Sequence, residues 1–259
     1  MKISMLYGAL GGDIIGSRFE WHNLKSKDFE LFGDRSKFTD DTVMTIATAD
    51  ALLHRLDFAE AYRAWGSRYP HAGYGGRFRS WLNSDFPRPY NSWGNGSAMR
   101  VGPVGFFFDS VERVLAEAER SAAVTHNHPE GIKGAQVAAL AVFLARTGSS
   151  KAAIRSEIET RFDYDLSSKT LDDIRPDYRF DVSCTGTLPV ALLAFLESES
   201  YEDAIRNAVS VGGDSDTIAA VTGGIALAFY RTMDERTARG IEARLTGEIL
   251  DICREFGDI

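Results

Sequence analysis

Hydrophobic positions recur along most of the chain with the three- and four-residue spacing of α-helices. Residues 42–53 carry a broad apolar stripe, and residues 134–145 and 217–230 are apolar on nearly every side, which predicts buried helices. Strand signals are few. Residues 101–108 have a composition that would suit a strand, although their glycines and proline weaken that assignment. The pattern therefore predicts an almost wholly helical chain.

Polar residues suited to capping mark where several helices begin. Four such residues open an apolar-periodic segment: Asp57, Asp109, Ser200 and Asp234. Pro129 stands where a first-turn proline belongs, and the last helix is expected to run from residue 234 to Cys253. We expect about ten helices packed as a single domain over residues 1–259, an all-α fold whose longest loop is 164–179.

The composition indicates a folded protein with no affinity for membranes or for nucleic acid as such. Hydrophobic residues make up 44% and charged residues 25% of the 259 positions, which excludes global disorder. The net charge of −8 supplies no general basic field, so nucleic acid is expected only as a modified substrate. The apolar segments are too short for a membrane span, and the first residues lack the apolar core of a signal peptide. Cys184 and Cys253 form no CxxC motif, so we expect a reducing, cytoplasmic location.

Two short segments hold the clearest chemistry. Residues 39–42 are Thr-Asp-Asp-Thr, and residues 212–217 are Gly-Gly-Asp-Ser-Asp-Thr. Each places two carboxylates and at least one hydroxyl at the start of an apolar helix. Capping needs one oxygen, and burying two unpaired carboxylates would be strongly unfavourable. A divalent cation is one compensation, and ligands that are all oxygen suit Mg²⁺, Mn²⁺ or Ca²⁺ rather than Zn²⁺.

Either segment alone is explained more simply as a polar helix start on the surface. The presence of both, each before a buried helix, favours a shared site instead. If the segments meet, four carboxylates and two hydroxyls could hold two ions, and paired ions can polarise a substrate and activate a water.

Three glycine-rich stretches carry weaker signals. Residues 8–16 lack the spacing of a dinucleotide fingerprint and predict a helix whose small residues allow close packing, with Glu20 just past its end. Residues 73–76 precede a helical segment at 77–82, and backbone N–H groups at such a start bind phosphate, although an ordinary turn explains them equally well. Residues 92–100 combine an aromatic ring, small residues and an arginine, as a nucleotide pocket does.

His126 and His128 are separated by one residue, a spacing that suggests a zinc site. No third nitrogen or sulfur ligand follows at a usual spacing, so the pattern favours His126 as a hydrogen-bond donor to substrate or as a residue at a helix start. No GxSxG or Cys–His signature indicates a catalytic triad, and both cysteines are expected to be core thiols.

Together these motifs resemble the ADP-ribosylglycohydrolase family, which includes the dinitrogenase reductase-activating glycohydrolases. The family's order is matched from Gly8 to about Tyr230 by GALGGDIIGSRFEW, FTDDTVM, GYGG, SWGNGSAMRVGP, THNHPEGIKGAQ and VGGDSDTIAAVTGGIALAFY. The resemblance implies an all-α orthogonal bundle with a binuclear Mg²⁺ or Mn²⁺ centre at one end of a cleft. It also implies hydrolysis of the bond between the distal ribose C1 of ADP-ribose and an acceptor.

The resemblance further implies which residues form the site. The metal ligands would be Thr39, Asp40, Asp41, Asp214, Asp216 and Thr217. Glu20 would lie near the ions as the acid that gates the substrate, and Gly75 and Gly76 would face the diphosphate. The ribose and adenine side would be lined by Ser92, Trp93, Gly94, Asn95 and Gly96. His126 would reach the distal ribose or the diphosphate.

In the mechanism that the resemblance implies, a water attacks C1 while positive charge develops on the ribose, and Glu20, Asp40 or Asp41 takes the proton. The chain leaves little room for inserted loops that recognise the acceptor, which could be arginine, serine, a nucleic-acid base or a small molecule such as O-acetyl-ADP-ribose. The alternatives are an inactive ADP-ribose-binding module, against which the complete set of oxygen ligands argues, and a metal-dependent phosphoesterase. The His-Asn-His-Pro-Glu run resembles bacterial members, in agreement with a cytoplasmic enzyme.

Overall fold

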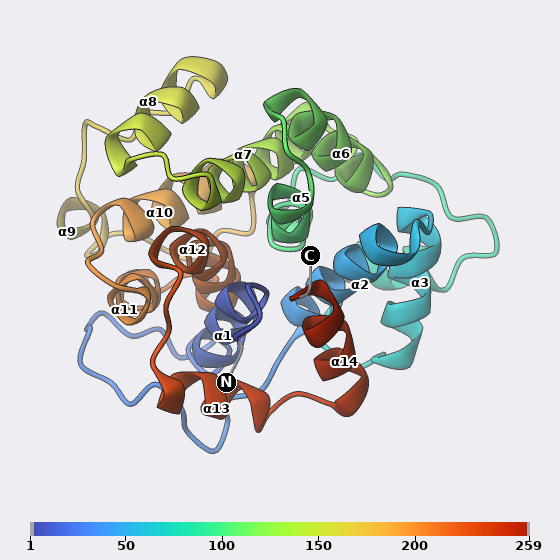
Figure 1. Cartoon of the computed structure of the whole chain (residues 1–259), viewed down its shortest axis with the longest axis horizontal. Helices are drawn as coiled ribbons and strands as arrows, with labels where there is room; N and C mark the ends of the chain where they lie inside the picture. Colours follow the sequence, from blue (N-terminus) through green and yellow to red (C-terminus); the bar gives the residue numbers. More distant parts are fainter. Residues whose placement is uncertain (1–2, 258–259) are drawn as a thin grey trace.

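The computed structural model describes residues 3–257, and this part of the chain forms fourteen α-helices and one 3₁₀ turn, η1 (Figure 1). The prediction of an all-α fold is confirmed, while the expected number of about ten helices was too low. The elements are α1 (Tyr7–Gly16), α2 (Asp40–His54), α3 (Phe58–Arg68), α4 (Gly76–Leu82), η1 (Asn95–Ser97), α5 (Gly102–Phe107), α6 (Val111–Ala123), α7 (Pro129–Arg146), α8 (Lys151–Phe162), α9 (Leu171–Ile174), α10 (Cys184–Leu196), α11 (Tyr201–Val211), α12 (Ser215–Tyr230), α13 (Glu235–Glu242) and α14 (Gly247–Phe256).

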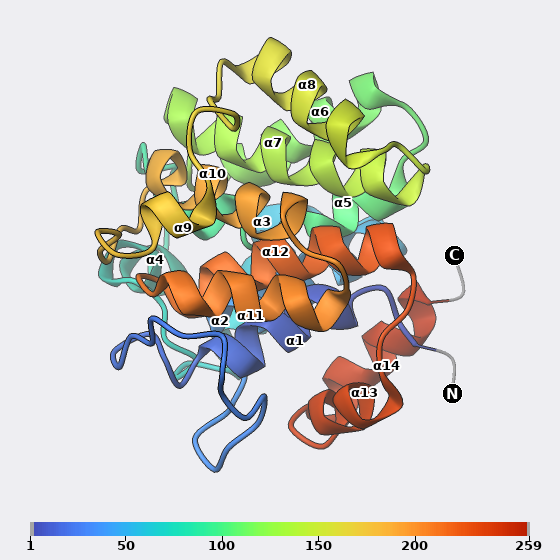
Figure 2. The same cartoon turned by 90° about the vertical axis from the view of Figure 1, so that its left-hand side faces the viewer.

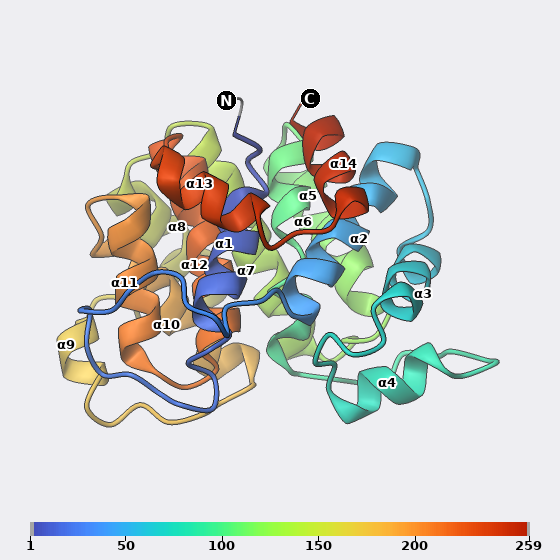
Figure 3. The same cartoon turned by 90° about the horizontal axis from the view of Figure 1, so that it is seen from below.

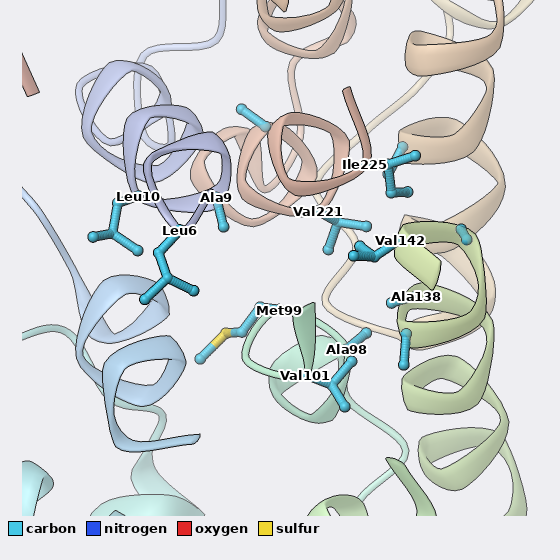
Figure 4. Packing of buried hydrophobic residues seen from close by; sticks show 14 of the residues in the cluster. Leu6, Ala9, Leu10, Ala98, Met99, Val101, Ala138, Val142, Val221 and Ile225 are labelled. Carbon is cyan, nitrogen blue, oxygen red and sulfur yellow. The ribbon is translucent and has the colours of Figure 1, made fainter. Parts of the chain in front are cut away.

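Helix α12 lies at the centre of the packing. Figures 1 and 2 show it between α1 on one side and α7 on the other, with α10 and α11 beside it. Its residues are buried from the first turn to Ala228, as the continuous apolar pattern predicts. Figure 4 shows Ala9 of α1, Val221 and Ile225 of α12 and Val142 of α7 gathered around the same part of the core. A polar group at the start of α12 therefore lies inside the protein.

Helices α1 and α12 approach so closely that glycine is required along their contact. Gly8, Gly12 and Gly16 are four residues apart and lie on one face of α1, against α12. A Cβ on Gly16 would lie 2.5 Å from the carbonyl oxygen of Ser215, and one on Gly12 would overlap the carbonyl of Ala219. Small residues do allow close packing here, as the sequence predicts, and this packing sets how α1 meets the first turn of α12.

A pair of glycine substitutions tests this contact. We expect Gly12→Ala to destabilise the protein by about 3 kcal/mol, because neither backbone can move away without disturbing the core. Gly224→Ala in α12 is the matched control, since its Cβ would lie 3.7 Å from Ala9 Cβ, an ordinary contact. That control should be neutral or stabilising, by up to about 1 kcal/mol. Urea unfolding of both variants measures the difference, and equal stabilities would contradict the tight contact.

Most of the predicted helix starts are confirmed. The side chains of Asp57, Ser200 and Asp234 accept hydrogen bonds from backbone N–H groups in the first turns of α3, α11 and α13. Pro129 occupies the first turn of α7. The start assigned to Asp109 lies one residue later, because Ser110 caps α6 by accepting from the N–H of Arg113.

Three local predictions were wrong in part. Residues 101–108 are not a strand: they contain helix α5, where Gly105 lies against the carbonyl oxygen of Ala139 in α7. The last predicted helix is two helices, since the chain turns between Glu242 and Gly247 before α14 begins. The loop at 164–179 includes the short helix α9, which has a capping box at Thr170.

One histidine links two helices at the surface. His54 of α2 places Nδ1 2.7 Å from Asp50 Oδ1 and Nε2 3.2 Å from Glu255 Oε1 of α14. The hydrogen bond to Asp50 and the charge of Glu255 raise the pKa of His54 above its ordinary value. The protonated ring makes both ion pairs, so their stabilisation is complete below the pKa of the unfolded chain. It is lost as pH rises through the pKa of the folded protein.

Melting temperatures measured from about pH 5 to pH 8 should therefore fall less steeply in a His54→Gln variant than in the unmodified protein. The effect is small, because the ring is exposed and its ion pairs are screened. A variant with an unchanged pH dependence would show that this histidine does not couple α2 to α14.

None of the helices described is both long enough and apolar enough to cross a bilayer.

Candidate active site

Acidic residues from α1, α2 and α12 converge at one end of the bundle. Carboxylate oxygens of Asp13, Asp41 and Asp216 lie within 4.8 Å of one another, and so do those of Glu20, Asp214 and Asp216. The hydroxyl of Thr217 donates to Asp41 Oδ2 at 3.2 Å, so the two acidic segments are in direct contact although 176 positions separate these residues. The glycine face of α1 makes this possible, because it brings the start of α12 against α1.

Asp13 is fully buried and joins α1 to the start of α2. Its Oδ2 accepts from the N–H of Thr39 (2.8 Å), the N–H of Thr42 (3.1 Å) and the Thr42 hydroxyl (2.5 Å). Its Oδ1 accepts from the Thr39 hydroxyl at 2.7 Å. One carboxylate thus satisfies two N–H groups at the N-terminus of α2, where the helix dipole also favours negative charge. It also fixes the direction of the Thr39 hydroxyl proton.

Asp41 is buried with one oxygen unsatisfied. Its Oδ2 accepts from Thr217, whereas no hydrogen-bond partner lies near Oδ1 among the residues described. Burial raises the pKa of Asp41 well above its ordinary value, and the charges of Asp13 and Asp40 raise it further. A buried oxygen without a donor, beside other carboxylates, is the arrangement that a cation stabilises.

Asp214 has a fixed orientation on the other side of the cluster. The side-chain amide of Asn95 donates to Asp214 Oδ2 at 2.7 Å and to the Thr187 hydroxyl at 3.0 Å. Asn95 is held in turn by its own N–H, which donates to the carbonyl of Val182 at 2.7 Å. The loop before α10 and the turn η1 therefore orient a carboxylate at the start of α12.

Burial also dominates the electrostatics of the other acids. Burial raises the pKa of Asp40 to about 7, and the negative charge of Asp13 is the next largest cause. Burial also raises the pKa of Glu20 to about 7, and there the negative charge of Asp214 is the next largest cause. Burial raises the pKa of Asp216 as well, and the charges of Asp41 and Asp214 add to this effect. The cluster holds more negative charge than its hydrogen-bond donors compensate.

The cluster forms the floor of a cleft with a volume of about 490 Å³. In Figure 3, α4 lies on one side of this face of the molecule and α9, α10 and α11 on the other, with α1 and α2 between them. All but two of the sequence-predicted site residues line the cleft. The lining residues are Glu20, Asp40, Asp41, Gly75, Gly76, Ser92, Trp93, Gly94, Asn95, Gly96, His126, Asp214 and Thr217. Thr39 and Asp216 do not line it, and both are buried at the cluster.

Two glycines and one aromatic pair shape the rest of the cleft. A Cβ on Gly75 or Gly76 would meet nothing within 4 Å, so packing inside the chain does not require glycine there. At the mouth, the exposed rings of Trp21 and Phe180 stack with their centroids 5.2 Å apart. The bare backbone leaves room for close approach of a ligand, and the aromatic pair stands beside Glu20.

The two histidines have separate roles. His128 caps α7, because its Nδ1 accepts from the N–H of Glu130 at 3.1 Å. His126 lines the cleft and contacts Thr125. Among the described residues, the groups of side chains close enough to hold a metal ion together contain only carboxylates. Neither histidine belongs to such a group, so no zinc site forms around them there. Cys184 and Cys253 are buried, and burial raises the pKa of each thiol to about 12, so neither is a nucleophile.

Sequence reasoning missed several residues of this site. Asp13 stands alone inside an apolar helix, where one aspartate gives no pattern; a single charge in an otherwise apolar helix was the available signal. Arg77 and Tyr90 line the cleft from α4 and the segment after it, and the sequence assigned neither of them a role; Arg100, the arginine of residues 92–100, lines it as that segment suggested. Their contacts join positions far apart in the chain, which spacing alone does not show.

The helical bundle and the buried acidic cluster beneath its cleft define the candidate active site of an all-α enzyme. A model of the ADP-ribosylglycohydrolase family matches residues 3–255, so the chain belongs to that family and is an ADP-ribosyl glycohydrolase. Its reaction is the hydrolysis of an ADP-ribosyl linkage.

Individual relatives agree with this assignment. The chain is 27% identical to the human "ADP-ribosylhydrolase ARH3", over 87% of this chain and 84% of that protein. It is 28% identical to the "ADP-ribosylarginine hydrolase Tri1" of Pseudomonas putida, over 87% of this chain and 69% of that protein. A solved structure named "ADP-ribosylglycohydrolase-related protein complex" superposes with a TM-score of 0.77 at 24% identity, covering 99% of this chain and 96% of its own. This last likeness concerns the fold.

Proposed function

We propose that this enzyme cleaves the bond between the distal ribose C1 of ADP-ribose and an acceptor, and that it depends on divalent cations. The chain would act as one catalytic domain. The convergence of residues 39–41 and 214–217 beneath the cleft carries the proposal, together with the buried Asp41 Oδ1 that lacks a donor. In this proposal the cations are held by Thr39, Asp40, Asp41, Asp214, Asp216 and Thr217.

The residues present fit such a centre. All six offer oxygen atoms, which Mg²⁺ and Mn²⁺ prefer, and the clustered negative charge has few donors to offset it. Cations bound here would supply positive charge that orients ribose hydroxyls and lowers the pKa of a water. Among the proposed ligands, Asp41 and Asp214 each belong to one group of close carboxylates and Asp216 belongs to both, so two ions could share Asp216.

The protein's own groups would then perform the remaining steps. Gly75 and Gly76 would admit the diphosphate against bare backbone, and Ser92 to Gly96 would hold ribose and adenine. Glu20, Asp40 and Asp41 are the proposed proton acceptors, and Glu20 is the one of these outside the proposed cation ligands. Fixing the ribose against these carboxylates supplies much of the acceleration expected of a well-oriented reaction.

Purified protein should be tested with ADP-ribose linked to arginine, to serine, to a nucleic-acid base and as O-acetyl-ADP-ribose. We expect ADP-ribose to be released from at least one of them with Mg²⁺ or Mn²⁺, and chelation to abolish the release. Turnover that is unaffected by chelation would overturn the cation-dependent mechanism. Tight ADP-ribose binding without turnover would indicate a binding module, and release of inorganic phosphate would indicate a phosphoesterase.

A further inference from the structure

His126 lies in the wall of the cleft directly after the end of α6. The backbone N–H groups of Thr125 and His126 both donate to the carbonyl of Ala122, which continues the last turn past the helix. Thr125 is fully buried and His126 is 5% exposed. The short connection holds both side chains in place, so the surroundings of the imidazole decide how it meets a ligand.

Hydrogen bonds link three polar side chains in a row from the core to the cleft, and the imidazole of His126 is the last of them. Arg100 is buried, with its guanidinium 4.2 Å from the centre of the Tyr62 ring. Its Nη2 donates to the Thr125 hydroxyl at 2.9 Å and to the carbonyl of Ser121 at 2.9 Å. The Thr125 hydroxyl lies 2.7 Å from His126 Nδ1. A guanidinium only donates, so one end of the chain has a fixed polarity.

That polarity determines where the proton of the imidazole resides. Arg100 occupies a lone pair of the Thr125 oxygen, and its charge favours a hydroxyl proton that points away from it, toward His126 Nδ1. A ring nitrogen that accepts a hydrogen bond carries no proton in the neutral imidazole, so this arrangement favours the proton on Nε2. Burial, followed by the charges of Arg100 and Arg77, holds the pKa of His126 well below its ordinary value, so the ring is neutral.

The other ring nitrogen faces glycine backbone. A Cβ on Gly96 would lie 3.0 Å from His126 Nε2, and one on Gly94 would lie 3.8 Å away. The absence of side chains at these positions leaves Nε2 open to the cleft, which Arg77 also lines. A donor and a cation on the same stretch of wall suit an anionic oxygen such as that of a phosphate.

We propose that Arg100 and Thr125 are positioning residues that hold His126 as a neutral imidazole with its proton on Nε2, from which it donates to a phosphate oxygen of the substrate. The identity of that substrate rests on the function proposed above. Because the donor is neutral, its hydrogen bond persists across the neutral pH range, whereas a titrating histidine would bind phosphate more tightly as pH falls.

Substitutions at Thr125 separate positioning from folding. Thr125→Val keeps the shape and removes the hydroxyl, whereas Thr125→Ser restores it. Thr222→Val is the matched control: Thr222 is equally buried, donates to the carbonyl of Ala191 at 3.0 Å, and does not line the cleft. Nitrogen-15 NMR of the ligand-free protein should show a His126 proton on Nε2 in the unmodified, Thr125→Ser and Thr222→Val proteins. Thr125→Val should show a mixture of the two tautomers.

Kinetics provide the second measurement. We expect Thr125→Val to raise KM about tenfold with little change in kcat, as the loss of a hydrogen bond to a non-reacting phosphate would do. Thr125→Ser should recover most of the affinity, and Thr222→Val should match the unmodified enzyme.

A proton found on Nδ1 in the unmodified protein would overturn the proposal, since Thr125 would then accept from the ring. So would unchanged KM and tautomer in Thr125→Val. The NMR measurement needs no substrate. A correct tautomer in a protein that releases no ADP-ribose would therefore refute the proposed function and leave the three-residue chain supported.

Discussion

Replacing Asp216 with asparagine should reduce ADP-ribosyl hydrolysis by about a thousandfold or more, without unfolding the protein. The side chain is buried at the start of α12 and belongs to both groups of close carboxylates. Asparagine has the same shape and retains an oxygen that can accept from the N–H of Thr217, as Asp216 Oδ1 does at 3.0 Å. It removes one negative charge from the cluster that we propose as the cation site.

The same substitution should lower activity without lowering the stability of the metal-free protein. This stability can be measured without an activity assay. Removing a charge relieves repulsion among buried acids, so metal-free Asp216→Asn should melt at the same temperature as the unmodified protein or higher. Millimolar Mg²⁺ should raise the melting temperature of the unmodified protein by mass action and should have little effect on the variant. Asp251→Asn, at an exposed ion pair on α14, is the control for loss of a carboxylate. Equal Mg²⁺ shifts in the two variants would contradict a cation site at Asp216.

Much of this site could be predicted from local sequence, because each half of it is a short contiguous segment. Residues 39–42 and 212–217 carry their carboxylates on helix starts, and capping chemistry makes such starts recognisable. Their meeting depends on Gly8, Gly12 and Gly16, whose four-residue spacing gives α1 a bare face. The sequence predicts the close packing of that face, but it does not say which helix lies against it.

Local rules failed where a distant contact decides the structure. Residues 101–108 resemble a strand in composition, yet Gly105 lets α5 pack against the backbone of α7, and this contact stabilises a helix. The turn before α14 likewise interrupts a regular apolar pattern. Arg100, Thr125 and His126 form one chain of hydrogen bonds, although Arg100 and Thr125 are 25 positions apart and no spacing rule joins them.

Asp13→Asn should leave the fold intact while severely weakening cation binding. Asparagine can place its oxygen where Oδ2 now accepts from the N–H of Thr39 and from the N–H and hydroxyl of Thr42. Its amide nitrogen would then stand where Oδ1 accepts from the Thr39 hydroxyl. The amide nitrogen is a donor, so the direction of this hydrogen bond is reversed. The Thr39 hydroxyl oxygen would accept from the amide, and one of its lone pairs would be occupied. Thr39 would become a poorer ligand, with its proton turned toward Asp41 and the site of the ions.

The expected loss of activity is about tenfold to a hundredfold, with a matching loss of Mn²⁺ affinity measured by calorimetry or electron paramagnetic resonance. Asp13→Ala is the informative partner, because it leaves two N–H groups and two hydroxyls at the start of α2 without an acceptor. It should melt well below Asp13→Asn, since buried donors without partners are destabilising. If Asp13→Asn bound Mn²⁺ as tightly as the unmodified protein does, the direction of the Thr39 hydroxyl would have no part in holding the ions, and Asp13 would serve the fold alone.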